Sequence, residues 1–416
     1  PCGTVADDIW AMGVLFHHLH TGQYPLTPLP DVPGGDPVIS GMIQRMLHPD
    51  PAQRQLDTTV EACLPLWSQL RNDNTLVNEE HLVQLFRALM RQKRRMRWDA
   101  GVYTIDRTNV IGNVFAAFEF LNLTDERVAY HLEFRYQGEP GEGSGPTRDV
   151  YQQFFQEVRA HGLFDPAHGL PSSCPTCDDC PYQHKYELLG TIMAKVVLDD
   201  LIVPVPMCRA WTRFLMNKQV TTDDLREVSQ EEFNMIYCLQ QEPNITSFRI
   251  PWHPGRFVTN ENKIGYIQER TRHFLFHGRK TALRALRKGF TSFRMARQLL
   301  HILPVARVHS FLFGTAGARV DDVPFSWNNG VPDQTKRWFL NWLSDSSVPL
   351  LLRWCTGSSR LSSPASPITI GVSSTLLYPR AQTCSRTLLL PINVADEPEL
   401  RRLLDIAVQQ LTFSFP

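Results

Sequence analysis

The run of residues 128–158 constrains the fold more than any other part of this 416-residue chain. Apolar side chains alternate along its first part, at Val128, Tyr130, Leu132, Phe134 and Tyr136. Such alternation predicts a half-buried strand, and a glycine-rich turn and a helical pattern follow it without a break. We therefore expect an α+β fold from Gly101 to the end, because segments of both kinds continue.

The glycine-rich turn, residues 138–145, has the composition of a phosphate-binding loop. However, Glu139 and Glu142 lie inside it and would repel a phosphate group. The dipeptide Pro146-Thr147 that follows is typical of a turn and a helix start. The turn is therefore interpreted as structural.

Composition predicts a protein partner. Lys and Arg number 42, as do Asp and Glu, so no net charge attracts nucleic acid or anionic lipid. An apolar run such as 299–305 is far shorter than the roughly 20 residues that span a bilayer.

The nine cysteines lack the spacing of a disulfide framework, which predicts a reducing compartment, the cytoplasm or the nucleus. Because the sequence begins with Pro1 rather than Met, in what resembles the middle of a domain, we expect a longer parent protein.

Residues 1–70 form a first, helical block, with one predicted helix that ends at Gly22 and another over 38–47. Ten residues match two motifs of a protein kinase C-terminal lobe, which the block resembles: Asp8, Trp10, Gly13, Gly22, Pro25, Met46, Leu47, Asp50, Pro51 and Arg54. The phosphate loop, catalytic aspartate and magnesium motif of kinases are missing, as is the usual glutamate partner of Arg54. Phosphoryl transfer is excluded, and we interpret the block as a kinase remnant or half-domain, with docking as one candidate role.

Residues 71–100 are predicted to link this block to the rest as an amphipathic helix. A basic run at 91–97 closes the helix, and positive charge suits a helix C-terminus. We interpret the run as a solvated helix end rather than as a calmodulin or membrane-surface site.

Cys384 is the candidate nucleophile. It lies in a short polar stretch between two apolar runs, with Arg380 and Arg386 close in sequence. A thiol reacts as its thiolate, which cationic neighbours favour and apolar burial disfavours. A lone cysteine between two strands is a small core residue about as often as it is a nucleophile. The choice between these two roles therefore depends on the rest of the sequence.

Seven segments, which occur in this order along the chain, favour the role of a nucleophile for Cys384. They are TIDRTNVIGNVFAAFEF, HLEFRYQGEPGEGSGPTRDVYQQFF, YELLGTIMAKVVLDDLIVPVPM, FVTNENKIGYI, ALRALRKGFTSF, LLLRWCTGSSRLS and RAQTCSRTLLLP. Together they resemble a HECT domain, the catalytic module of one class of ubiquitin ligases, over about residues 101–416. The resemblance implies a bilobal α+β fold. Residues 101–330 would form a large, mainly helical N-lobe, a hinge would lie at 328–332, and residues 331–416 would form a small α/β C-lobe that carries the cysteine on a loop.

The resemblance also implies an activity, and it implies no cofactor. A ubiquitin-conjugating enzyme would load ubiquitin onto Cys384 as a thioester, and ubiquitin would then pass to a lysine of a protein substrate. Thr383 and Arg360 match family positions, and Phe413 matches an aromatic that helps to seat the C-lobe. The alternative for Phe413 is an ordinary tail or core residue.

Loss of a proton from the incoming lysine calls for a carboxylate base. Asp396, Glu397 and Glu399 follow the cysteine loop in the sequence. We interpret these three as a solvated turn.

Departures from the family leave a second hypothesis open, a HECT-fold binding scaffold that has lost transfer. Gln382 replaces the usual histidine, and the C-lobe segment before Cys384 is compressed. The subdomain that docks the conjugating enzyme is expected within 239–258 and looks shortened. Its remaining apolar anchors are Phe248, Ile250, Trp252 and Phe257.

Cys174, Cys177, Cys180 and His184 have the residue types and the short spacing of a zinc knuckle. Four ligands in so short a loop are tight for a tetrahedral site, and HECT domains do not usually carry a metal here. We therefore prefer a turn in an insertion before the next helix, and predict no bound metal.

Overall fold

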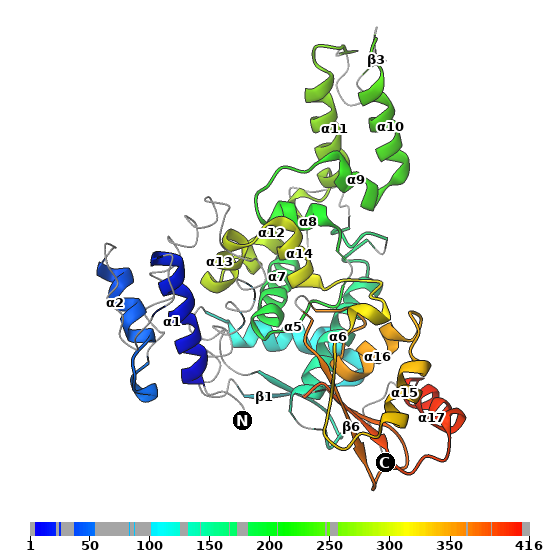
Figure 1. Cartoon of the computed structure of the whole chain (residues 1–416). Coiled ribbons are helices and arrows are strands. Elements are labelled where there is room, and N and C mark those ends of the chain that lie inside the picture. The colour runs from blue at the N-terminus through cyan, green and yellow to red at the C-terminus, as the bar shows by residue number, and fades with distance from the viewer. Residues whose placement is uncertain are drawn as a thin grey trace. The chain divides into compact units, whose positions relative to one another are not determined.

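The structure is a computed structural model in which the chain divides into two units (Figure 1). Unit 1 comprises Pro1–Trp98 and Arg297–Pro304, and unit 2 comprises Asp99–Ala296 and Val305–Pro416. The residues that the structure describes are 5–21, 25, 37–54, 83, 87, 101–124, 132–141, 143–165, 167–172, 182–205, 207–245, 248–249, 257–362, 365–383 and 385–409. Among them, no helix combines the length and the apolarity needed to cross a bilayer.

In unit 1 the helices α1 (Val5–Thr21) and α2 (Pro37–Met46) agree with the two predicted helices. Ile9 and Phe16 of α1 and Ile43 of α2 are buried. A β-carbon on Gly13 would lie 2.8 Å from Leu47 and Met46, so glycine is what lets the two segments approach. Residues 55–70 of the block lie outside the described residues. So does most of the linker helix 71–100.

Arg54 joins the end of this helical pair to its beginning. Its guanidinium donates to the carbonyl oxygens of His48 (2.8 Å) and Ala6 (3.0 Å), and Nη1 lies 3.8 Å from an Asp7 carboxylate oxygen. Asp7 thus supplies an acidic neighbour where the kinase-like pattern lacks its glutamate. The kinase resemblance itself stays a prediction.

Unit 2 begins with a parallel pair of short strands, β1 (Val102–Ile105) and β2 (Glu133–Tyr136), beside the helices α5 (Val110–Leu121) and α6 (Ser144–Ala160). Further helices follow: α7 (Gln183–Leu198), α8 (Arg209–Leu215), α12 (Lys280–Phe290) and α14 (Val305–Phe313). Most of α13 (Arg294–Ile302) belongs to unit 1. This part of unit 2 is mainly helical.

The glycine-rich turn after β2 is tied to its surroundings by protein groups. The Glu133 carboxylate accepts a hydrogen bond from the Gly143 backbone (2.8 Å), and Thr147 Oγ1 accepts from the Phe134 backbone (2.9 Å). Arg107 pairs with Glu139 and lowers the pKa of that carboxyl. These contacts agree with the structural interpretation of the turn, and they fix the start of α6.

A projecting substructure extends from the helical part of unit 2 (Figure 1). It is built from the helices α9 (Thr222–Val228), α10 (Gln230–Gln241) and α11 (Lys263–Phe276). The strands β3 (Phe248–Arg249) and β4 (Phe257–Val258) pair antiparallel between α10 and α11. The segment 239–258 therefore belongs to a larger element that starts near Thr222.

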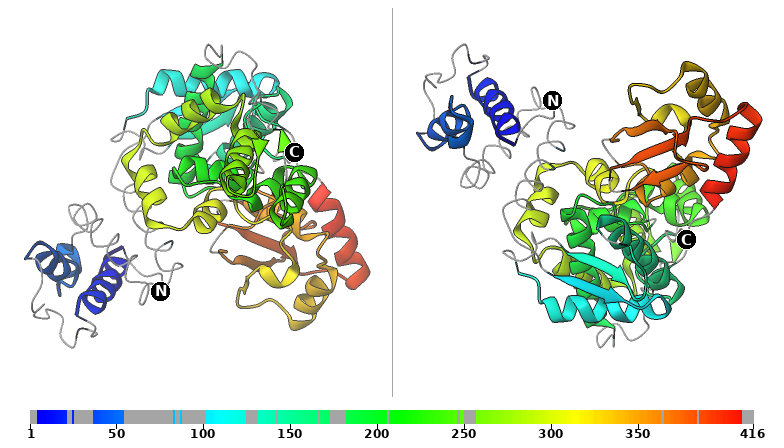
Figure 2. Two further views of the ribbon diagram at one scale, coloured as in Figure 1. Left: turned by 90° about the horizontal axis from the view of Figure 1, so that it is seen from above. Right: turned by 90° about the horizontal axis from the view of Figure 1, so that it is seen from below.

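The C-terminal part of unit 2 is a four-stranded sheet with the order β5-β6-β8-β7, in which only β7 runs antiparallel to its neighbour. Its strands are β5 (Phe325–Trp327), β6 (Ile368–Ser373), β7 (Arg380–Gln382) and β8 (Thr387–Pro391). Three helices share a core with the sheet (Figure 2): α15 (Asp333–Trp342), α16 (Val348–Thr356) and α17 (Glu397–Gln409). Helices and sheet together make a small α/β unit, and this mixed content agrees with the expected α+β class.

The sheet argues against the predicted lobe boundary between residues 330 and 331. Strand β5 pairs with β6, and the Asn328 backbone donates to Ile370 O (2.9 Å). Ala318 and Val323 are buried in the same core. Because these contacts place the segment from Ala318 onward with the C-terminal sheet, we propose the lobe boundary between Phe313 and Ala318. Gly314 and Gly317, both with positive φ, provide the backbone freedom there.

Candidate active site

The candidate nucleophile belongs to the tight connection between β7 and β8. These strands pair antiparallel, with Gln382 opposite Thr387, and the described residues Thr383, Ser385 and Arg386 lie in the turn between them. Cys384 itself lies outside the described residues. Of its neighbours, Thr383 is buried, Arg386 is half-buried, and Gln382 and Ser385 are exposed. A turn at a strand end of this kind can present one side chain to a large reaction partner.

Arg148 of α6 holds this turn from the other lobe. Its Nη1 donates to the carbonyl oxygen of Thr383 at 2.6 Å, and also points to that of Thr356 at 3.4 Å. Arg386 adds a second positive charge within the turn and adopts the left-handed backbone region, at φ 52°. Positive charge near a thiol favours its thiolate form.

Arg360, in the motif that matches the family, acts on the connection between the lobes. Its Nε donates to Phe313 O and its Nη2 to Gly314 O (3.0 Å), at the end of α14. Burial lowers the pKa of Arg360 from its ordinary value. The residue therefore bonds the segment after α16 to the backbone where the two lobes meet.

A small cavity of about 40 Å³ lies beside the turn and draws its lining from both lobes. Arg148 and Asp200 line it from the helical part, and Thr356, Arg360 and Arg386 from the C-terminal part. Sequence reasoning identified neither Arg148 nor Asp200 as a site residue. Both lie in segments that resemble the family, but their part in the site becomes visible only when the lobes pack.

The carboxylates that follow the loop in sequence serve as helix caps and surface contacts. Asp396 accepts from the Glu399 backbone (2.9 Å), and Glu399 accepts from the Ala395 backbone (2.8 Å) at the start of α17. Glu397 lies near Asn341. These contacts fit the interpretation of a solvated turn.

The other described cysteines differ sharply in accessibility. Cys208 and Cys355 are buried, and burial raises the pKa of the Cys208 thiol to about 12 and that of Cys355 well above its ordinary value. Neither can supply a thiolate at neutral pH. Cys238, on α10, is exposed.

The predicted docking residues fall on the tip of the projecting substructure or outside the described residues. Phe257 on β4 is 47% exposed, and Phe248 pairs with Val258 through β3. Ile250 and Trp252 lie outside the described residues. Sequence reasoning missed the exposed apolar side chains on the two long helices, which are Met235 and Tyr237 on α10 and Ile264 on α11.

The remaining predicted residues receive little support or none. Phe413, Cys174, Cys177 and Cys180 lie outside the described residues. His184 is exposed, and its Nε2 lies 3.3 Å from a carboxylate oxygen of Glu119. No group of side chains suited to a metal ion occurs in the described part of the chain.

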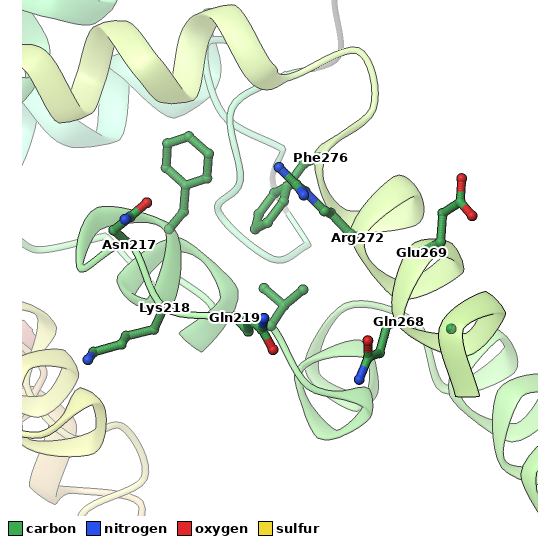
Figure 3. Close-up of a pocket in the computed structure, with 10 residues that line it drawn as sticks. Asn217, Lys218, Gln219, Gln268, Glu269, Arg272 and Phe276 are labelled. Carbon is green, nitrogen blue, oxygen red and sulfur yellow. The ribbon is translucent and has the colours of Figure 1, made fainter.

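A larger cavity, about 470 Å³, lies where α11 meets the connection between α8 and α9 (Figure 3). Its lining mixes Phe214, Val220 and Phe276 with amide and charged side chains, among them Gln219 and Arg272. No cysteine or histidine lines it, so it offers no thioester chemistry.

Comparison with known proteins identifies the fold. The family model described as HECT-domain (ubiquitin-transferase) matches residues 149–415, which is more than half of the chain and includes the β7–β8 turn. The match begins later than the resemblance found by motifs, and it does not extend to the kinase-like block. A search of curated proteins gave no match. The chain therefore belongs to the HECT-domain family of ubiquitin transferases.

Proposed function

We propose that this chain is an active HECT-type ligase that carries ubiquitin as a thioester on Cys384. The observation that carries the proposal is the β7–β8 turn: it contains Cys384 in sequence, and two arginines, Arg148 and Arg386, adjoin it. The buried thiols of Cys208 and Cys355 are unsuited to the role. The cysteine content favours a reducing compartment, where a free thiol persists.

The proposed reaction has two steps. The Cys384 thiolate attacks the carbonyl carbon of ubiquitin's C-terminal glycine, and the thiolate of the conjugating enzyme leaves. The amine of a substrate lysine then attacks the new thioester, the Cys384 thiolate leaves, and the amine loses a proton. Thioester exchange is nearly balanced in energy, so orientation matters more than a strong base in the first step.

The projecting substructure is the proposed docking surface for the conjugating enzyme. Tyr237, Phe257 and Ile264 are between 47% and 71% exposed on α10, β4 and α11. Exposed aromatic and aliphatic side chains that become buried in a complex commonly supply most of its binding energy. The exposed apolar residues on the two helices extend the surface beyond the shortened segment that the sequence indicated.

The test is ubiquitin loading with purified activating enzyme, a panel of conjugating enzymes and three forms of this chain. Wild type should form an adduct that reductant removes, Cys384→Ala should form none, and Cys238→Ala should still form a reductant-sensitive adduct. Cys238 is the control for the identity of the nucleophile because its thiol is exposed. Because it lies on α10, within the proposed docking surface, the presence of its adduct is compared and not the rate of loading. A reductant-sensitive adduct that persists in Cys384→Ala would contradict the assignment of the nucleophile.

A binding scaffold that has lost transfer is the second candidate. Gln382, which is exposed and lies 3.4 Å from Ser385 Oγ, stands where the family usually has a titratable histidine. A scaffold would bind a conjugating enzyme and yet form no adduct in wild type. The loading assay, run beside a binding measurement, therefore separates the two candidates.

A further inference from the structure

One side chain of the N-lobe, that of Arg148, bonds directly to the cysteine turn. Arg148 belongs to the first half of α6, a helix that packs with α5 and β2. Its guanidinium reaches the carbonyl oxygen of Thr383, the residue immediately before Cys384, at 2.6 Å. The same nitrogen lies 3.4 Å from Thr356 O at the end of α16. One cation thus bridges two segments of the C-lobe.

The chemistry of these acceptors suits an arginine. Thr356 lies at the C-terminus of α16, where unpaired carbonyl groups and the helix dipole attract positive charge. The guanidinium also has several donors in a fixed plane, which lets it serve two carbonyl groups at once. A charge-assisted bond as short as 2.6 Å is among the stronger kinds of hydrogen bond.

Two glycines allow the lobes to approach at this point. A β-carbon on Gly145 of α6 would lie 3.3 Å from Thr383 Oγ1, the one described atom outside its own turn of helix within 4 Å. A β-carbon on Gly357, which follows α16, would lie 3.3 Å from the β-carbon of Arg148. A side chain at position 145 would crowd Thr383, and one at position 357 would crowd Arg148. The close packing at these two glycines is an observation separate from the hydrogen bonds of Arg148. Both observations indicate that the turn packs against α6.

We propose that Arg148 is a positioning residue that holds the Cys384 turn against α6 for the second step, the attack of the lysine amine. The inference rests on the proposed function. Loading requires the turn to meet a conjugating enzyme, whose proposed docking surface is α10, β4 and α11, and α6 is not part of that surface. Contact with α6 therefore serves the step in which the conjugating enzyme takes no part.

The first test separates loading from discharge in the full chain. Wild type and variants are loaded with ubiquitin, loading is stopped, and free lysine is added as the acceptor. Arg148→Ala should discharge about tenfold more slowly than wild type, the factor expected for losing one good charge-assisted hydrogen bond. Its loading rate should change less than threefold, and it should still unfold cooperatively in urea. Arg148→Lys, which can reach one carbonyl group, should fall between the two.

The matched control is Arg159→Ala. Arg159 lies on the same helix, eleven residues beyond Arg148, which is about 16 Å along the axis and out of reach of the turn. It should load and discharge like wild type. This control accounts for the loss of one arginine from α6.

A second variant tests the docking without touching the arginine. Gly145→Leu should push Thr383 away from α6, because Thr383 is the neighbour that a side chain there would meet. It should reproduce the slow discharge and normal loading of Arg148→Ala.

Three results would overturn the proposal. Normal discharge in both variants would show that the contact has no part in transfer, and an equal loss in loading and discharge would show a merely structural role. Faster loading with normal discharge would make the contact a restraint on the first step. Failure of wild type to load at all would contradict the proposed function itself and remove the basis of this inference.

Discussion

His309 illustrates how burial sets the chemistry of a single residue in unit 2. Its Nδ1 lies 2.8 Å from Thr212 Oγ1, and its ring packs against Phe313. Burial lowers the pKa of His309 to about 4, and Arg360 and Arg209 add to the effect while Glu227 opposes it. The imidazole is therefore neutral in the folded protein at physiological pH. It is a structural residue, located where α14 leads into the connection between the lobes.

The lowered pKa of His309 predicts that the folded protein loses stability as the pH falls. The unfolded chain takes up the His309 proton near pH 6.5 and the folded chain only near pH 4, so the stabilisation is complete above pH 6.5 and falls between these values. Between pH 6.5 and pH 5 the loss should be about 2 kcal/mol at most. Urea unfolding at several pH values measures it.

The matched variant is His309→Asn, whose amide can still bond to Thr212 and does not titrate. Its free energy of unfolding should vary less with pH across this interval than that of wild type. An identical pH dependence in both proteins would mean that other groups cause the acid sensitivity.

The helices α7 and α12 cross in unit 2 with their backbones in direct contact. A β-carbon on Gly190 of α7 would overlap the carbonyl oxygen of Leu286, and one on Gly289 of α12 would overlap that of Glu187. The two backbones touch, so both positions require glycine. The amphipathic patterns of these helices predict burial, and only the crossing explains the glycines.

Gly190→Ala should destabilise unit 2 by about 2 kcal/mol or more, because the helices would have to separate to admit a methyl group. Gly265→Ala in α11 is the control, since a β-carbon there meets nothing within 4 Å. It should be neutral or stabilising by up to about 1 kcal/mol, as expected for an exposed helix position. Urea denaturation compares the two, and equal stabilities would contradict the close crossing.

At the scale of the whole molecule, the proposed activity needs two separate surfaces of unit 2. The β7–β8 turn would carry ubiquitin, and the projecting substructure would dock the conjugating enzyme. Arg360 and the glycines at 314 and 317 lie where the lobes join. Communication between the surfaces then depends on how this connection allows the C-lobe to move.

Phe257→Ala should raise the concentration of conjugating enzyme needed for half-maximal loading about tenfold, because truncation of an interface anchor typically costs 1–2 kcal/mol or more. Discharge of preloaded ubiquitin to free lysine should be unchanged. Leu340→Ala, which removes a similarly exposed apolar side chain from α15, is the control and should load normally. An unchanged loading curve for Phe257→Ala would locate docking elsewhere.

The sequence by itself determined the family and much of the local structure. The apolar pattern of residues 183–198 predicts the helix that forms α7, and the alternation that ends at Tyr136 predicts β2. The family motif around Cys384 consists of consecutive residues, so it can be recognised in the sequence alone. The candidate nucleophile could therefore be predicted before the structure was known. Patterns of this kind depend only on neighbours in the chain, through backbone preference and the burial of one face.

Only the tertiary structure decided which distant groups meet. Arg148 and Thr383 are 235 residues apart, and no local pattern in either segment encodes their bond. The predicted hinge at 328–332 proved to adjoin a paired strand, because β5 is short and its partner β6 lies about forty residues later. Such contacts depend on how whole elements pack and on the closing of long loops, and these are set by the sum of many weak interactions spread over the chain.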